Sequence, residues 1–291
     1  MRLKQILKEI AFHNSMDYFG VAPIHRWNNA PEDSQPQYLL PNAKTVVVMG
    51  IKIRSGARYG NRLAYNGNKM AISIYMNSGF RFLNNMLDQA SYFIHRNLND
   101  NGFLSLALPA AHPYPYFGEF IFEKTRSVNL FSNRHAAVCA GIAEFGWNTL
   151  ALTPDAGPRV RYISVITEAE LEPDELRRGT PLCNKEKCQD PLICARICPM
   201  NAISLKEGQE LEIEDMTYTY AKLDRPKCLW GISGLRKATL GKKDCYMPEE
   251  KTLDAYYKAL SEKDFMENFE RLGDGSMCGR CIIECPVGET N

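Results

Sequence analysis

The sequence predicts a mixed α+β or α/β domain followed by a smaller cysteine-rich domain. Helix and strand patterns alternate over the first 175 residues, whereas all but one of the ten cysteines follow residue 182. The length of 291 residues is that of about two ordinary domains. We therefore expect one domain at residues 1–175 and a second at 176–291, with the boundary in the polar stretch 168–181.

The first helix is predicted by apolar residues with helical spacing: Leu3, Ile6, Leu7, Ile10 and Ala11. Charged residues occupy the place of a signal peptide's apolar core, and no run approaches the ~18 consecutive apolar residues of a membrane span. The net charge of +1 favours neither nucleic acid nor a membrane surface as a partner. We expect a cytoplasmic protein.

Strands and further helices follow in alternation. Residues 18–22 predict a short strand, and the β-branched run 44–53 predicts a strand covered on both faces. Weaker strand patterns lie at residues 103–108, 148–153 and 159–167, and a helix is expected near 133–144. Helices between strands favour an α/β domain. A long helix that stops at Asn101-Gly102 has one apolar stripe: Leu83, Leu87, Ala90, Ile94 and Leu98.

Two runs of cysteines each end in Cys-Pro. A bacterial two-cluster ferredoxin uses C-x2-C-x2-C-x3-C-P twice, and the fourth cysteine of each run ligates the other cluster. The first run has Pro191 at the second ligand position, where Cys183 is the obvious replacement. The second run has Gly275 at the first position, where Cys228 and Cys245 are both available. The runs contain Cys183, Cys188, Cys194 and Cys198, and then Cys278, Cys281 and Cys285.

Eight thiolates are enough for two [4Fe–4S] clusters, which predicts an electron-transfer protein. Zinc is the alternative, but zinc sites usually contain C-x2-C pairs, and only Cys278 and Cys281 form one. Disulfides would need an oxidising compartment. Neither alternative explains the paired Cys-Pro endings.

Segment 134–149 is the most distinctive part of the N-terminal region. Gly141 and Gly146 have the spacing of a phosphate loop, but no Lys-Ser or Lys-Thr follows Gly146, which excludes a Walker motif. The pattern G-x-G-x-x-G is absent as well, which argues against a dinucleotide site.

Together with the cysteine runs, this segment resembles the epoxyqueuosine reductase and reductive dehalogenase superfamily. That family has an arginine, a run A-x-x-A-G-x-x-x-x-G-x-N-T and a G-P or G-S turn before a two-cluster ferredoxin domain. Here these features are Arg134, residues 137–149 and Gly157-Pro158. The resemblance covers essentially the whole chain. It implies an oxidoreductase with a nitroreductase-like, cobalamin-binding domain at 1–175 and a ferredoxin-like domain at 176–291.

The resemblance also implies roles for individual residues. Five of them correspond to corrinoid-facing loops: Gly141, Gly146, Asn148, Thr149 and Gly157. Cys228 matches the isolated cysteine that completes one cluster. The implied ligand sets are Cys183, Cys188, Cys194 and Cys285 for cluster one, and Cys198, Cys228, Cys278 and Cys281 for cluster two.

Three departures from the family narrow the expected activity. Ser127 stands where epoxyqueuosine reductases place an acidic proton donor, seven positions before Arg134. We also expect a short member, without the helical-repeat tail that helps those enzymes hold tRNA and without the twin-arginine leader of exported dehalogenases. Queuosine synthesis and respiratory dehalogenation at the cell surface are therefore not expected.

The remaining candidates each have two interpretations. Tyr114 and Tyr116 lie in an aromatic, proline-containing loop that either donates a proton beside a cofactor or is a stiffened surface loop. Arg134 either contacts a cofactor or caps local carbonyls. We retain these three as candidate catalytic residues. Cys139 is expected to be a small core residue, and Cys245 either a spare ligand or a surface thiol.

The expected function is an iron–sulfur reductase that passes electrons from two clusters to cobalamin and reduces a small organic substrate. The alternatives are a non-enzymatic electron carrier or corrinoid-reducing partner, and an enzyme with flavin in place of cobalamin. Basic residues between Arg225 and Lys243 form either a solvated face or a dock for an acidic ferredoxin or flavodoxin.

Overall fold

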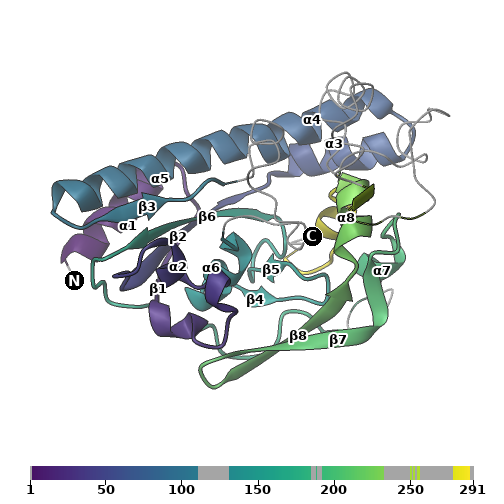
Figure 1. Ribbon diagram of the computed structural model, residues 1–291. Coiled ribbons are helices and arrows are strands. Elements are labelled where there is room, and N and C mark those ends of the chain that lie inside the picture. The colour runs from purple at the N-terminus through teal and green to yellow at the C-terminus, as the bar shows by residue number, and fades with distance from the viewer. Residues whose placement is uncertain are drawn as a thin grey trace.

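The computed structural model describes residues 2–110, 131–184, 188, 192–232, 250, 252, 254–255 and 278–288. Its centre is a four-stranded sheet in the order β1-β2-β6-β3 (Figure 1). Each neighbouring pair is antiparallel, so the arrangement is α+β rather than the parallel α/β type that alternating helices and strands suggest. The strands are β1 (Tyr18–Pro23), β2 (Thr45–Lys52), β3 (Ser105–Ala107) and β6 (Val160–Thr167).

The central strand β2 is buried on both faces, as its β-branched sequence predicts. Val47 and Met49 join the hydrophobic cluster under α1 (Arg2–His13) and α5 (Phe82–Asp100). Val46 and Val48 point the other way, into a cluster with α6 (Asn133–Cys139). Figure 1 shows α1 and α5 together along one face of the sheet and α6 across the other.

Two predicted helices have the expected faces, whereas a third ends early. All five residues of the predicted stripe of α5 are buried, and Leu7 and Ala11 anchor α1. The helix expected near residues 133–144 stops at Cys139, because Gly141 adopts a left-handed φ of 70° and ends it. The chain then forms β4 (Glu144–Phe145), which pairs with β5 (Ala151–Leu152), a shorter strand than the predicted 148–153.

Several elements were not anticipated from the sequence. Between β2 and α5 lie α3 (Ser55–Tyr65), η3 (Lys69–Ala71), α4 (Ile72–Met76) and a π-helical turn, η4 (Asn77–Arg81). Short turns η1 (Ile24–Trp27) and η2 (Glu32–Ser34) and helix α2 (Pro36–Leu39) follow β1. The C-terminal part contains α7 (Ile193–Arg196), the hairpin of β7 (Ile203–Ile213) and β8 (Met216–Leu223), α8 (Arg225–Ile232) and α12 (Arg280–Ile283).

The β7–β8 hairpin packs against the N-terminal region. Ile213 and Tyr218 belong to the same hydrophobic cluster as Val46 and Val48 of the central strand. The hydrophobic core is therefore continuous from residues before position 175 to residues after position 176. The division into two domains at this boundary remains a prediction. In the described part of the chain, no helix combines the length and apolar character needed to span a membrane.

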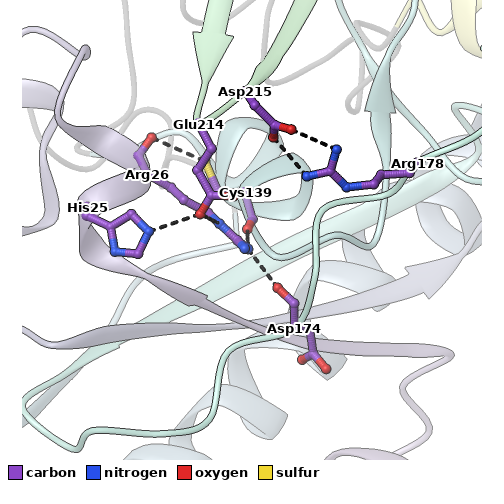
Figure 2. A network of polar contacts seen from close by, with 7 residues as sticks. All are labelled: His25, Arg26, Cys139, Asp174, Arg178, Glu214 and Asp215. Atoms are coloured by element: carbon purple, nitrogen blue, oxygen red, sulfur yellow. Dashed lines mark hydrogen bonds and ion pairs between the residues drawn. The ribbon is translucent and has the colours of Figure 1, made fainter.

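A buried arginine joins the hairpin tip to the N-terminal region (Figure 2). Arg26 is 8% exposed, and its Nε donates to Glu214 Oε1 at 2.7 Å. Its Nη1 donates to the carbonyls of Cys139 at 2.5 Å and Asp174 at 2.7 Å. His25 Nε2 lies 2.9 Å from the same oxygen of Glu214. Removing the Glu214 charge would leave a buried cation without its counterion, which is costly.

We predict that Glu214→Gln lowers the free energy of unfolding by about 1–3 kcal/mol at neutral pH, because it weakens a charge-assisted hydrogen bond. Burial alone would raise the pKa of Glu214, but hydrogen bonds from Arg26 and His25 outweigh burial and lower it. A lowered folded-state pKa stabilises the protein fully above the unfolded value of about 4.3, and this stabilisation is lost as pH falls through the folded value.

Urea denaturation of the wild type and Glu214→Gln between pH 7 and pH 3 measures this effect. The difference between them should shrink as the pH falls. Glu207→Gln, which removes an exposed pair with Lys222 on the same hairpin, is the control and should change stability little at any pH. A Glu214→Gln effect that is constant over this range would contradict the prediction.

Candidate functional site

Cysteines from three separate segments of the chain influence one another electrostatically, so they lie close together. They lie on or near α7, α8 and α12, and Figure 1 shows α7 and α8 on the same side of the molecule. Cys194 is 8% exposed, and burial raises its pKa to about 12, with the neighbouring thiols of Cys183, Cys285 and Cys188 adding to the shift. Burial likewise raises the pKa of Cys285 to about 11, and Cys183 and Cys188 add to it. These four thiols form group one. Cys285 belongs to it although it lies about 90 residues further along the chain than the other three.

The second group has the complementary membership. Burial raises the pKa of Cys228 to about 12, and the thiols of Cys278 and Cys198 add to the shift. The pKa of Cys281 lies well above its ordinary value, because of burial and then of Cys278, Cys228 and Cys198. Group two is thus Cys198, Cys228, Cys278 and Cys281. Cys194 of group one also acts on Cys281, so the two groups are neighbours.

The chemistry of these groups suits a metal cluster. Each group contains two thiols with a raised pKa, and such thiols keep their protons at neutral pH unless bound cations compensate the negative charge. Within the described residues, no three or more His, Cys, Asp or Glu side chains are placed to hold a single metal ion. A four-iron cluster with its sulfides is larger than one ion, and its four thiolates stand correspondingly farther apart.

Hydrogen-bond donors reach the sulfur atoms of both groups. The amide of Trp147 donates to Cys183 Sγ at 3.3 Å, and the amide of Ala202 donates to Cys198 Sγ at 3.3 Å. The Tyr65 hydroxyl, which donates to the carbonyl of Cys278 at 3.0 Å, also lies 3.5 Å from Cys278 Sγ. Such bonds reduce the negative charge on cluster sulfurs and tune the reduction potential.

The glycines predicted to face a corrinoid lie against other parts of the chain. A side chain at Gly141 would meet the carbonyl of Glu175, and one at Gly157 would meet the carbonyl of Val287. Gly146 lies against the Leu152 side chain. The structure therefore places protein, not an open cradle, beside these three positions.

Asn148 and Thr149 are also engaged within the chain. Asn148 Nδ2 donates to the carbonyl of Cys281 at 3.3 Å, and its Oδ1 accepts the amide of Leu150 at 3.2 Å. Thr149 has a left-handed φ of 64° and is 6% exposed. All five positions thus make contacts within the chain or are buried, and their role as cofactor ligands stays a prediction.

Arg134 lies beside group two. Its Nη1 donates to the carbonyl of Thr149 at 2.8 Å, so it caps a local carbonyl as one interpretation expected. Burial lowers its pKa, the Cys228 thiol opposes that shift and Arg225 adds to it. Burial and these two arginines also lower the pKa of His135 to about 3, so this imidazole is neutral. The catalytic role of Arg134 stays a prediction, and Tyr114, Tyr116 and Cys245 lie outside the described residues.

Sequence reasoning missed three side chains that meet group two. Asn61 Nδ2 and the Tyr65 hydroxyl donate to the carbonyl of Cys278 at 3.2 and 3.0 Å. Tyr75 is 3% exposed and lies against Gly279. Asn61 and Tyr65 are one helical turn apart on α3, so polar residues on the inward face of an amphipathic helix were the available signal.

Comparison with known proteins relates the chain to one group of reductases. No family model matches. The tetrachloroethene reductive dehalogenase of Dehalobacter restrictus is 35% identical over 107 residues, which are 34% of this chain and 19% of that protein. The tetrachloroethene reductive dehalogenase of Desulfitobacterium hafniense strain Y51 matches to the same extent. The chain thus spans about a fifth of the length of these curated relatives.

Solved structures share the fold at lower identity. An epoxyqueuosine reductase matches with a TM-score of 0.51 and 16% identity over 99% of this chain and 66% of its own. A catabolic reductive dehalogenase matches with a TM-score of 0.54 and 17% identity over 95% of this chain and 37% of its own. Another matching structure is described as a reductive dehalogenase that suggests a mechanism for B12-dependent dehalogenation, with the same identity and TM-score and 36% of its length covered.

We predict that Gly157→Ala destabilises the protein by about 2–5 kcal/mol. Gly157 has a left-handed φ of 55°, which costs other residues about 1–2 kcal/mol, and the added methyl group would collide with Val287. Gly56→Ala is the matched control, because nothing lies within 4 Å of a side chain there. Guanidinium denaturation under anaerobic conditions compares the two, and equal effects would refute the close approach of Val287.

Proposed function

We propose that this chain is an oxidoreductase in which two [4Fe–4S] clusters pass electrons to a bound cofactor. The reduced cofactor then reduces a small organic substrate. The relationship of the chain to the reductive dehalogenases and epoxyqueuosine reductases supports this proposal. The observation that carries this proposal is the gathering of eight thiols into two neighbouring groups of four. Their membership is that of a two-cluster ferredoxin, in which the last cysteine of each run joins the other cluster.

In this proposal each group of thiols ligates one cluster. Group one holds cluster one, with Cys285 as the ligand from the second run. Group two holds cluster two, with Cys198 from the first run and Cys228 of α8 as the isolated ligand. The gathering of four thiols in each group favours this assignment over inert buried cysteines, because bound iron supplies the positive charge that neighbouring thiolates lack.

The similarity to these reductases favours cobalamin as the bound cofactor. When bound, cobalamin would supply the reactive metal centre. The five predicted corrinoid-facing positions make their contacts within the chain, so we derive no step through the macrocycle from them. Flavin is the alternative cofactor. Tyr114 and Tyr116 remain the proposed proton donors.

The proposed electron donor is an acidic ferredoxin or flavodoxin. Arg225 is exposed at the start of α8, one turn before Cys228, and Lys227 pairs with Asp224 at 2.7 Å. Basic residues at this place would steer an acidic partner towards cluster two. A non-enzymatic electron carrier is the second candidate function, and Ser127, at the position of the family's acid, favours it.

We predict about eight iron atoms per chain after anaerobic reconstitution, as two four-iron clusters require. Cys285→Ala should remove the electron paramagnetic resonance signal of cluster one and leave that of cluster two. Cys139→Ala, which removes a buried thiol outside both groups, is the control and should keep all the iron. One zinc and little iron would end the proposal, whereas loss of the cluster ligated by Cys198 in Cys285→Ala would reverse the crossed assignment.

We also predict that the reconstituted protein binds cobalamin. Titration with cobalamin should shift its visible absorption bands, and cobalt should remain with the protein after gel filtration. No shift and no retained cobalt, together with bound flavin, would move the assignment to a flavin-dependent reductase. Iron-loaded protein that binds neither cofactor but reduces a second redox protein would favour the carrier.

A further inference from the structure

Two consecutive residues, Trp147 and Asn148, each reach a different thiol group. The Trp147 amide donates to Cys183 Sγ of group one at 3.3 Å. Asn148 reaches group two, because its side-chain Nδ2 donates to the carbonyl of Cys281 at 3.3 Å. Cys183 and Cys281 lie far apart in the sequence, so one short segment of the chain connects both groups.

The segment that carries these two residues is a tight, strained turn between β4 and β5. The Gly146 amide donates to the carbonyl of Leu150 at 2.9 Å, and the Thr149 amide donates to the carbonyl of Gly146 at 2.9 Å. Thr149 has a left-handed φ of 64°, which a β-branched residue adopts only where its surroundings enforce it. Asn148 Oδ1 supports the turn from inside by accepting the amide of Leu150 at 3.2 Å. Backbone strain of this kind is concentrated at functional sites, and here it fixes Trp147 and Asn148 relative to each other.

The β7–β8 hairpin holds Trp147 in place. Trp147 is 4% exposed, and its indole Nε1 donates to the carbonyl of Ser204 at 2.9 Å. Its own carbonyl accepts the amide of Ala221 at 3.1 Å. Gly208 lies so close to the ring that a side chain there would come within 3.3 Å of two ring carbons. The indole is therefore attached to β7, and the backbone of Trp147 is attached to β8.

Trp147 also belongs to the apolar surroundings of both thiol groups. It shares a hydrophobic cluster with Cys194 of group one, and three partly buried cysteines pack against that cluster: Cys183, Cys198 and Cys281. The first of these belongs to group one, and the other two belong to group two. A large ring buried at this place takes the space that water would otherwise fill. The apolar shell of a metal site controls the access of solvent and thereby the reduction potential.

We propose that Trp147 and Asn148 are positioning residues that hold the two clusters at a fixed separation, and that the Trp147 indole keeps water from the sulfurs of group one. The fixed separation of the clusters rests on the proposed function, whereas the shielding of the thiols by the indole does not. The β7–β8 hairpin has a matching function in this proposal. It anchors the indole, and its tip is held in turn by the ion pair of Glu214 with Arg26.

Electron paramagnetic resonance of the fully reduced, iron-loaded protein tests the separation. Two reduced clusters at a short and fixed distance split each other's signals. Asn148→Ala removes the hydrogen bond to Cys281 and should broaden or abolish this splitting while both clusters remain bound. Asn14→Ala, which removes a side chain bonded to the carbonyl of Ile10 on α1, is the matched control and should leave the splitting unchanged. A wild type without splitting, or an unchanged splitting in Asn148→Ala, would overturn the positioning role.

Alkylation of the reduced, iron-free protein with iodoacetamide tests the shielding without any cluster. Trp147→Ala should speed the modification of Cys183 and Cys194 several-fold relative to Cys139, a buried thiol outside both groups, as followed by mass spectrometry. Trp27→Ala is the matched control, because Trp27 is also 4% exposed but belongs to the hydrophobic cluster with α6. It should not speed the modification of Cys183 or Cys194.

The two measurements separate the failure of this proposal from the failure of the proposed function. Equal rates of alkylation in the wild type and Trp147→Ala would overturn the shielding. If Trp147→Ala does not fold, Trp147→Leu replaces it and should give a smaller increase of the same kind, because it removes less of the side chain. A wild type that takes up no iron would overturn the proposed function and the separation of clusters, and faster alkylation in Trp147→Ala would still support the shielding. Iron-loaded variants that match the wild type in both measurements would overturn only the present proposal.

Discussion

The attachment of the C-terminal cysteines to the sheet through Arg159 is the interaction on which the rest of the site depends. Arg159 is 1% exposed, and its Nη1 donates to the carbonyl of Cys285 at 2.6 Å. Its Nη2 donates to the carbonyl of Val287. A buried guanidinium is tolerated when such acceptors surround it, so the arginine and the turn at 285–287 stabilise each other. Without this attachment Cys285 would lose its buried anchor beside the sheet, and group one would lose the support of its only ligand from the second cysteine run.

The elements that the sequence predicted correctly are those specified by local patterns. The apolar stripe of α5 and the β-branched run of β2 depend only on which faces are buried. The antiparallel pairing and the β7–β8 hairpin depend on contacts between distant residues, which periodicity does not encode. Helix α6 ends early because Gly141 has a left-handed φ of 70°. A glycine permits this angle, but its presence in the sequence does not predict it.

The cofactor positions illustrate a second limit of sequence reasoning. A glycine that makes room for a macrocycle and a glycine that makes room for a neighbouring carbonyl satisfy the same steric requirement. At Gly141 and Gly157 the neighbours in the structure are Glu175 and Val287. The cysteines were easier to interpret, because their spacing and the two Cys-Pro endings predict two clusters with crossed ligands, and this ligation stays a proposal. The sequence did not single out Asn61, Tyr65 and Tyr75. Their role depends on contacts with Cys278 and Gly279, which lie far away in the sequence.

The two thiol groups have different surroundings in the described part of the chain. Group two adjoins Arg134 and the tyrosines of α3 and α4, on the side of the N-terminal region, whereas group one adjoins Arg159 and the amide of Trp147. A nearby cation stabilises the reduced, more negative form of a cluster. Arg134 beside group two and Arg159 beside group one therefore each favour the reduced form of a cluster at that group. The direction of the proposed electron transfer is thus set by where the electron donor and the bound cofactor lie, and not by these two arginines.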